Sequence, residues 1–369
     1  MKKLLLLFLA LLSVTALVGC EKTETTEATE KIILITDKGD ITDKSFNQGA
    51  YEGVKAYAEA NDIDYDYVKP TDATNEYYIS AIETAINDGA TIIVTPGFLF
   101  ETPINEVQGD YPDVKFILLD GNPENAENGT LEDNVYSVFY AEHEAGFLAG
   151  YAAVKEGYRH LGFIGGLAVP AVQRFGHGYI QGIAKAAEEL DLADDAITVD
   201  YLYTGDFKAT PEVQSAAATM YENGAEVIFA CGGSVGQSVM AAAGDADGKV
   251  IGVDVDQSAD SDTVITSAMK SLSISVEQAL EAIFETNKWD DDFAGKSVVL
   301  DAKSDGVALP DDFSKFNNFT SADYDTLFAK LVDGTYDVDD TIGEFGDDGN
   351  ASKQFETDIV SVNVIKFEG

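Results

Sequence analysis

One eight-residue pattern occurs twice in this chain and constrains its fold more than any other sequence feature. Residues 46–53 and residues 175–182 both read F-x-x-G-x-x-x-G, both follow an apolar run, and both open a segment of helical periodicity. One layout used twice predicts two similar lobes. It also predicts that Phe46 and Phe175 face one another across the gap between these lobes. Other pairs keep nearly the same offset, namely Gly89 with Gly224 and Asp120 with Asp254.

Apolar runs typical of buried strands alternate with helical segments through most of the chain. Residues 32–35 are apolar throughout, as expected of a parallel strand covered on both faces. This alternation predicts an α/β fold with parallel sheets, helices on both faces and right-handed crossovers. We expect further strands at residues 65–68, 91–95, 115–119, 134–139, 160–164, 198–203, 226–230, 249–253, 263–267 and 359–367. We expect helices at residues 45–59, 76–87, 103–109, 141–156, 172–190, 211–223, 234–243 and 275–286, and one opened by a capping box of Thr320 and Asp323.

The repeat and the order of the expected elements predict how the chain divides between the lobes. We expect it to cross between them near residues 139–141, 256–260 and 295–299. The expected units are an N-terminal lobe of residues 31–140 plus about 258–296, a C-terminal lobe of residues 141–257 plus about 297–320, and an extension of residues 321–369 that packs on the lobes.

The N-terminus has the features of an export signal. Two lysines at positions 2 and 3 precede an apolar run at residues 4–18, which is too short for a conventional membrane span. The run ends in Leu-Val-Gly-Cys, which resembles the lipobox of bacterial lipoproteins. We therefore predict a signal peptide at residues 1–19, lipid attachment at Cys20 and a flexible tether at residues 20–30. The lipid would anchor the protein to the extracytoplasmic face of the cell membrane.

Charge excludes several classes of partner. The chain has 66 acidic and 23 basic residues, and its net charge is −43. Such a protein repels phosphate backbones and anionic lipid headgroups, so nucleic acid and direct binding to the membrane surface are excluded as partners. We interpret most of the acidic side chains as a solvated surface.

No complete catalytic or metal-binding set can be recognised in the sequence. The three histidines, His143, His160 and His177, lack the spacing of a zinc site. No P-loop occurs, and a Ser-His-Asp set cannot be assembled from recognisable motifs. Cys231, the only cysteine besides Cys20, leaves no disulfide and is expected to be a small buried apolar residue. We predict a binding protein with no metal and no cofactor, not an enzyme.

Two aromatic residues stand where ligands bind in parallel sheets, beyond the carboxyl ends of the strands. Phe46 or Phe175 alone would be expected to pack on a sheet edge. Their matching positions in the two lobes favour ring faces opposed across a cleft, which suits a flat heteroaromatic ligand. Stacking of this kind contributes about 1–3 kcal/mol per base.

Charged residues follow the same strand ends. Asp120 and Asp254 are expected to accept hydrogen bonds from ribose hydroxyls or purine N–H groups, although a strand-terminal Asp also serves as a turn former. Lys270 offers three donors and lies just beyond a strand in a chain with few basic residues; the alternative is a surface lysine.

Several short motifs occur together in this chain. They are the lipobox at residues 17–20, D-K-S-F-N-Q at 43–48, R-F-G at 174–176, C-G-G-S-V-G at 231–236, V-D at 253–254 and T-S-A-M-K at 266–270. Together they resemble the basic membrane protein family of lipoproteins, the purine-nucleoside receptors of ATP-binding cassette (ABC) importers. The resemblance covers about residues 31–310. It implies the type I periplasmic-binding-protein fold, with two Rossmann-like lobes joined by a three-segment hinge.

The resemblance also implies roles for individual residues. Phe46 and Phe175 would sandwich the purine, and Asp254 with Lys270 would hold the ribose hydroxyls. The base edge would be read by Asp120, with Asp37, Ser45 and Asn47 nearby, and the backbone of Gly232 and Gly233 would line the sugar. The partners implied are a purine nucleoside (guanosine, inosine or adenosine) and an ABC permease, with the protein acting as a monomer.

Other functions are compatible with the same fold. A sugar receptor would stack its aromatic faces on a pyranose, and a sensory lipoprotein would dock on a membrane kinase. A nucleoside hydrolase is disfavoured because no complete catalytic set can be recognised in the sequence. Two features have no counterpart in the resemblance: the strongly acidic charge, despite the family's name, and Cys231.

Overall fold

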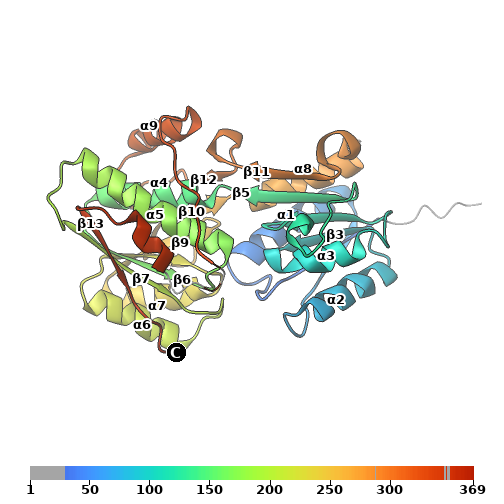
Figure 1. The fold of residues 1–369 in the computed structure, drawn as a ribbon, viewed down its shortest axis with the longest axis horizontal. Helices are drawn as coiled ribbons and strands as arrows, with labels where there is room; N and C mark the ends of the chain where they lie inside the picture. The colour runs from blue at the N-terminus through green and yellow to red at the C-terminus, as the bar shows by residue number, and fades with distance from the viewer. Residues whose placement is uncertain (1–29, 287, 345, 347–349) are drawn as a thin grey trace, which may run out of the picture.

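The computed structural model describes residues 30–286, 288–344, 346 and 350–369. The predicted signal peptide, the lipid attachment at Cys20 and the tether up to residue 29 lie outside these residues. The described chain forms two α/β lobes side by side, each built on its own sheet (Figure 1). The predicted α/β fold with two lobes is confirmed.

The sheet of the first lobe is parallel. In the described chain its six strands lie in the order β2 (Asp64–Val68), β1 (Lys31–Ile35), β3 (Ile92–Pro96), β4 (Lys115–Leu119), β5 (Val135–Tyr140) and β11 (Lys296–Leu300). Alternate side chains of β1 enter different cores: Ile33 and Ile35 pack under α2 (Asn75–Asn87) and α3 (Glu101–Val107). Ile32 and Leu34 pack under α1 (Phe46–Asn61) and α8 (Leu272–Phe284). Burial on both faces explains why residues 32–35 of β1 are all apolar.

The sheet of the second lobe has seven strands among the described residues. Their order is β12 (Val307–Ala308), β10 (Val264–Lys270), β9 (Lys249–Asp254), β8 (Val227–Cys231), β6 (His160–Gly165), β7 (Ile197–Tyr203) and β13 (Val360–Val364). Its pairs are parallel except that of β10 with β12. The helices of this lobe are α4 (Glu142–Glu156), α5 (Pro170–Glu189), α6 (Pro211–Glu222), α7 (Val235–Ala246) and α9 (Ser321–Val332).

Two of the three predicted crossings between the lobes lie further along the chain than expected. The first falls between β5 and α4, as predicted. The second follows Lys270 rather than residues 256–260, because β10 pairs with β9 and so belongs to the second sheet. The third follows β11, which pairs with β5 in the first sheet. The lobe boundaries expected at about 258 and 297 are corrected accordingly.

The C-terminal extension belongs to the second lobe. The predicted capping box opens α9, where Thr320 accepts from the Asp323 amide and the Asp323 carboxylate accepts from the Thr320 amide. The chain then runs along α5, where the Gln173 side chain bonds to Gly343 and Glu344 at 2.7 and 3.1 Å. It ends in β13, which extends the sheet beyond β7.

The glycines of the repeated pattern explain why the pattern occurs twice. A Cβ at Gly53 in α1 would lie 2.6 Å from the Ser273 carbonyl oxygen of α8, and one at Gly178 in α5 only 1.9 Å from the His143 oxygen of α4. Helix α1, which begins with Phe46, therefore packs backbone to backbone on α8. Helix α5, which carries Phe175, packs in the same way on α4, and both α8 and α4 follow a crossing between the lobes. The pattern thus reflects helix packing next to the hinge as well as the site.

We expect Gly178→Ala to lower the free energy of unfolding by about 3 kcal/mol, because the added methyl group overlaps a helix backbone that cannot move aside alone. Urea denaturation measures the change. Gly244→Ala is the matched control: Gly244 lies in helix α7 with open space where its Cβ would be. That variant should gain up to about 1 kcal/mol, and equal effects of the two substitutions would contradict the packing account.

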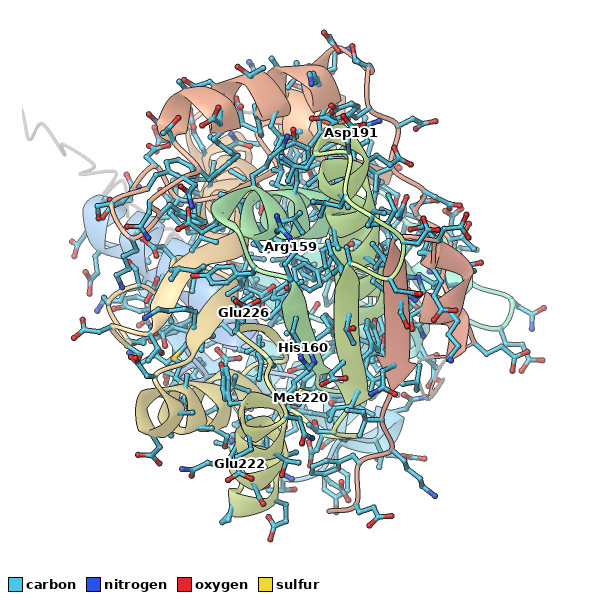
Figure 2. The ribbon with its side chains drawn as sticks, turned by 90° about the vertical axis from the view of Figure 1, so that its left-hand side faces the viewer. Arg159, His160, Asp191, Met220, Glu222 and Glu226 are labelled. Atoms are coloured by element: carbon cyan, nitrogen blue, oxygen red, sulfur yellow. The ribbon has the colours of Figure 1, made fainter. Side chains whose placement is uncertain are left out.

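A separate set of side chains lies at the amino ends of the strands in the second sheet. The Glu226 carboxylate accepts from the backbone amides of Arg159 and His160 at 2.6 and 3.1 Å, and these residues lie close together in Figure 2. His160 Nε2 lies 3.0 Å from Asp200. His160 therefore stands at the amino ends of β6 and β8, away from the carboxyl ends where the candidate ligand residues lie.

Candidate functional site

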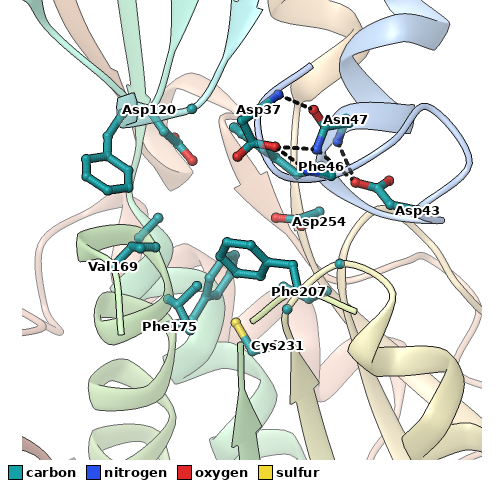
Figure 3. A pocket seen from close by; sticks show the side chains of 18 of the residues that line it. Asp37, Asp43, Phe46, Asn47, Asp120, Val169, Phe175, Phe207, Cys231 and Asp254 are labelled. Atoms are coloured by element: carbon teal, nitrogen blue, oxygen red, sulfur yellow. Dashed lines mark hydrogen bonds between the residues drawn. The ribbon is translucent and has the colours of Figure 1, made fainter. Parts of the chain in front are cut away.

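A cavity lies between the lobes, where the carboxyl ends of both sheets meet. The predicted ligand-binding residues other than Ser45 line it; Figure 3 shows several of them pointing into the space. The first lobe contributes Asp37, Phe46, Asn47 and Asp120, and the second Phe175, Gly232, Gly233, Asp254 and Lys270.

Lys270 is the electrostatic centre of the cavity. Its Nζ lies 2.5 Å from Asp120 Oδ2, 2.9 Å from Glu142 Oε1 and 3.9 Å from Asp254 Oδ1. Burial alone would lower the pKa of Lys270, but these carboxylates outweigh it and hold that pKa above its usual value. Lys270 is therefore a buried cation that links the first lobe to the second, and the alternative of a surface lysine is wrong.

Glu142 and Arg174 complete this network and were not identified as site residues from the sequence. Arg174 Nε donates to Glu142 Oε2 over 2.6 Å, and Glu142 is fully buried. Burial raises the pKa of Glu142, but Arg174 and Lys270 reverse the shift and lower it to about 2. The available signal was compositional, because Arg174 is one of only two arginines in the chain and directly precedes Phe175.

Asp120 lines the cavity and has one buried oxygen without a protein partner in the described chain. Its Oδ2 binds Lys270, whereas its buried Oδ1 has no hydrogen-bond partner in the described part of the chain. Burial raises the pKa of Asp120 to about 7, although Lys270 acts to lower it. An unpaired buried acceptor is unfavourable, so a ligand N–H or O–H group placed here would gain a strong hydrogen bond.

Asn47 is used internally rather than offered to a ligand. Its Nδ2 donates to Asp37 Oδ1 and to Asp43 Oδ2, both over 3.0 Å, and its Oδ1 accepts from the Asp37 amide. The Asp43 carboxylate also accepts from the amides of Ser45, Asn47 and Gln48 at the start of α1. Both hydrogens of the Asn47 amide are therefore occupied, and its role is to orient the carboxylate of Asp37.

Ser45 and Asp254 connect the lobes instead of both facing the cavity. Ser45 Oγ donates to Asp254 Oδ2 across the interface. Gln257 of the second lobe donates to the Lys44 carbonyl at 2.6 Å, and Lys38 lies 3.9 Å from Asp206. Burial raises the pKa of Asp254, and the Ser45 hydrogen bond and Lys270 oppose this. These contacts describe lobes closed over the cavity.

In the described chain, four phenyl rings line the cavity, two from each lobe: Phe46 and Phe98, and Phe175 and Phe207. Phe46 is half-buried, whereas Phe175 is 2 % exposed and its ring meets Phe229 edge to face at 5.9 Å. The rings of Phe46 and Phe175 lie 4.9 and 5.3 Å from Lys270 Nζ. Phe175 thus borders the cavity but is also part of the core of its own lobe.

Phe98 and Phe207 were missed from the sequence. Phe98 begins a short 3-10 turn, Phe98–Phe100, just after β3, and Phe207 lies in the loop after β7. Figure 3 shows Phe207 between the lobes near Cys231. Both residues follow a predicted strand, so the rule that ligands bind beyond carboxyl strand ends would have found them.

The second lobe also supplies backbone and a thiol. Gly233 has φ 55°, and a Cβ at Gly232 would lie 2.6 Å from the Gly166 amide nitrogen, so the chain here approaches its neighbour closely. Cys231 is 1 % exposed, and burial raises the pKa of its thiol well above the usual value. Cys231 is therefore a buried neutral thiol beside the cavity, as predicted.

None of the helices in the described residues is long and apolar enough to cross a membrane. In the same part of the chain, no group of three or more His, Cys, Asp or Glu side chains is placed to hold a metal ion.

Comparison with known proteins points to one family of substrate-binding proteins. The Bmp family model, described as ABC transporter substrate-binding protein PnrA-like, matches residues 30–336. The ABC transporter nucleoside-binding protein BmpA of Lactococcus lactis is 28% identical over 82% of this chain and 89% of its own length. An uncharacterised lipoprotein of Pyrococcus furiosus is 27% identical over 80% of this chain and 75% of its own. A crystal structure of an ABC transporter solute-binding protein from Aeropyrum pernix superposes with a TM-score of 0.70 and 23% identity, covering 83% of this chain and 92% of that one.

Proposed function

The chain belongs to the Bmp family of ABC transporter substrate-binding proteins, which are receptors and not enzymes, and on that premise we propose that it captures purine nucleosides in the interlobe cavity. The observation that carries the proposal is the pairing of phenyl rings from both lobes with the unpartnered Asp120 Oδ1. Rings that oppose one another bind a flat base by stacking. A buried carboxylate oxygen accepts hydrogen bonds from the N–H groups of that base.

The charge of the cavity favours a nucleoside over a nucleotide. Among the described residues, the cavity lining and the network of Lys270, Glu142 and Arg174 contain five carboxylates and two cations: Asp37, Asp43, Asp120, Glu142 and Asp254 against Arg174 and Lys270. Both cations already lie within 3 Å of a carboxylate oxygen. A phosphate group would meet uncompensated negative charge in a region of low dielectric, which is strongly unfavourable.

Delivery to a permease follows from the family, and the anchor is part of the proposal. We propose that Cys20 carries the lipid that holds the receptor on the extracytoplasmic face of the membrane. A relative in Pyrococcus furiosus is named a lipoprotein, which supports this assignment. Mass spectrometry of the membrane fraction would detect the lipid, and Cys20→Ser should release the protein.

Calorimetric titration tests the ligand class. We expect one molecule of guanosine or inosine to bind per chain, and ribose, galactose and the corresponding monophosphates to bind at least about 100-fold more weakly. Binding of a pyranose in preference to any nucleoside would instead support the sugar receptor. Tighter binding of guanosine monophosphate than of guanosine would contradict the charge argument.

The affinity for guanosine should fall by about tenfold or more between pH 8 and pH 5.5. Burial raises the pKa of Asp120 to about 7 in the ligand-free protein. Because a ligand N–H needs the ionised carboxylate, binding weakens as the pH falls through that value and levels off above it. Lys270, Glu142 and Arg174 face Asp120, and all three remain charged over this range. Titrations in one buffer series measure the effect, and Asp120→Asn should flatten it.

A further inference from the structure

The polar side chains by which the first lobe lines the cavity are mostly hydrogen-bond acceptors. Its polar side chains in the lining are Asp37, Asp43, Asn47 and Asp120. Asn47 is the only side-chain donor among these described lining residues, and both of its N–H bonds point to carboxylates of the protein. A ligand edge placed against this wall must therefore supply the hydrogen atoms.

Two carboxylate oxygens of this wall are placed to receive them. Asp120 Oδ1 is buried and has no partner in the described chain, and Asp120 as a whole is 8 % exposed. Asp37 Oδ1 is held by the Gly39 amide at 2.8 Å and by Asn47, which leaves Oδ2 as its other acceptor. That oxygen lies against Gly97, where a Cβ would be 2.9 Å away. Figure 3 shows both carboxylates directed toward the cavity.

Purines differ in what they offer to such a wall. Guanine carries N1–H and a 2-amino group side by side, hypoxanthine carries N1–H alone, and adenine has a lone pair at N1 beside its 6-amino group. Against two acceptors, the adenine 6-amino group can donate to one. The N1 lone pair then faces a carboxylate lone pair at the other. A buried acceptor that one ligand satisfies and a similar ligand leaves unsatisfied discriminates strongly between the two.

Resting on the proposed function, we propose that this cavity selects 6-oxopurine nucleosides over adenosine, in the order guanosine, inosine, adenosine. Asp120 reads the N1–H group. Asp37, oriented by Asn47, reads the 2-amino group that only guanosine among the three possesses. Both residues contact the ligand directly, whereas Asn47 is a positioning residue.

Calorimetric titration of the unmodified protein at pH 8 tests the selection without any substitution. Guanosine should bind about 10- to 100-fold more tightly than adenosine. In 1-methylguanosine a methyl group replaces the N1–H, and its affinity should fall about 100-fold below that of guanosine. Adenosine binding as tightly as guanosine, or 1-methylguanosine binding unimpaired, would overturn the selection. If none of the nucleosides binds, the proposed function itself fails, which is a different outcome.

Two variants separate the roles of the carboxylates. Asp120→Asn gives the wall a donor that can bind adenine N1, so the preference for guanosine over adenosine should shrink to about threefold or less. Asp37→Asn should instead reduce the preference for guanosine over inosine and leave that for inosine over adenosine. The control is Asp245→Asn, the same change at an exposed position of α7. It should leave each ratio as in the unmodified protein, and identical ratios in all three variants would contradict the assignment.

Discussion

Replacing Lys270 with methionine is expected to lower the free energy of unfolding at pH 8 by about 3–5 kcal/mol and to abolish nucleoside binding. Lys270 is the cation that Asp120, Glu142 and Asp254 share inside the closed cavity. Methionine fills similar space but leaves these buried carboxylates with Arg174 as their remaining cation in the network. Removing one partner of a buried ion pair costs this much because the charge left behind is uncompensated.

Urea denaturation at several pH values measures the Lys270→Met effect. The carboxylates that lose Lys270 acquire still higher pKa values, so the destabilisation should be largest at pH 8 and shrink toward pH 5 as they become protonated. Lys185→Met removes a partly exposed lysine that lies 3.4 Å from Glu188 and serves as the control. It should cost less than about 1 kcal/mol. A cost independent of pH for Lys270→Met would show that the carboxylates do not depend on this ammonium.

Phe175→Ala should mainly lower stability, whereas Phe46→Ala should mainly weaken guanosine binding. Phe175 is 2 % exposed and packs on Phe229, so its truncation should cost about 3–5 kcal/mol of unfolding free energy. Phe46 is half-buried at the first turn of α1, and its truncation should affect stability much less. On the binding side, loss of a stacking ring at Phe46 should weaken guanosine affinity by about 1–3 kcal/mol.

Thermal unfolding and guanosine titration of both variants distinguish the two roles. If Phe46→Ala binds guanosine as well as the unmodified protein does, Phe46 is not a stacking residue. In that case Phe207→Ala becomes the informative variant, because Phe207 enters the same cavity from the second lobe. A folded Phe175→Ala protein with unchanged stability would contradict its placement in the core.

The lobes could be predicted because the features that define them are local and repeated. Strands buried on both faces are apolar throughout. In the F-x-x-G-x-x-x-G pattern, Gly53, Gly178 and Gly182 lie against a neighbouring helix backbone, which explains the glycines in both halves. The sheet to which β10 belongs could not be predicted in this way. An apolar strand carries no sign of which sheet edge it joins, and β10 pairs with β9 before the chain crosses.

The sequence predicted which residues line the cavity better than it predicted what each of them does there. Asp37, Asp120, Asp254 and Lys270 were found from their places after strands, but their partners are set by residues distant in sequence. Lys270 binds Asp120, 150 positions away, and Ser45 binds Asp254, 209 positions away. Asn47 was predicted near the ligand, yet its amide is occupied by Asp37 and Asp43. Glu142 reads as an ordinary acid in the first turn of a helix, so its burial was not visible in the sequence.

Aromatic rings and carboxylates of the two lobes are proposed to form a site for a neutral purine nucleoside, and calorimetric titration of the intact receptor with guanosine tests this. One guanosine should bind per chain, with ribose and guanosine monophosphate at least about 100-fold weaker. Absence of heat with guanosine and inosine, under conditions where a sugar or a nucleotide binds, would contradict it.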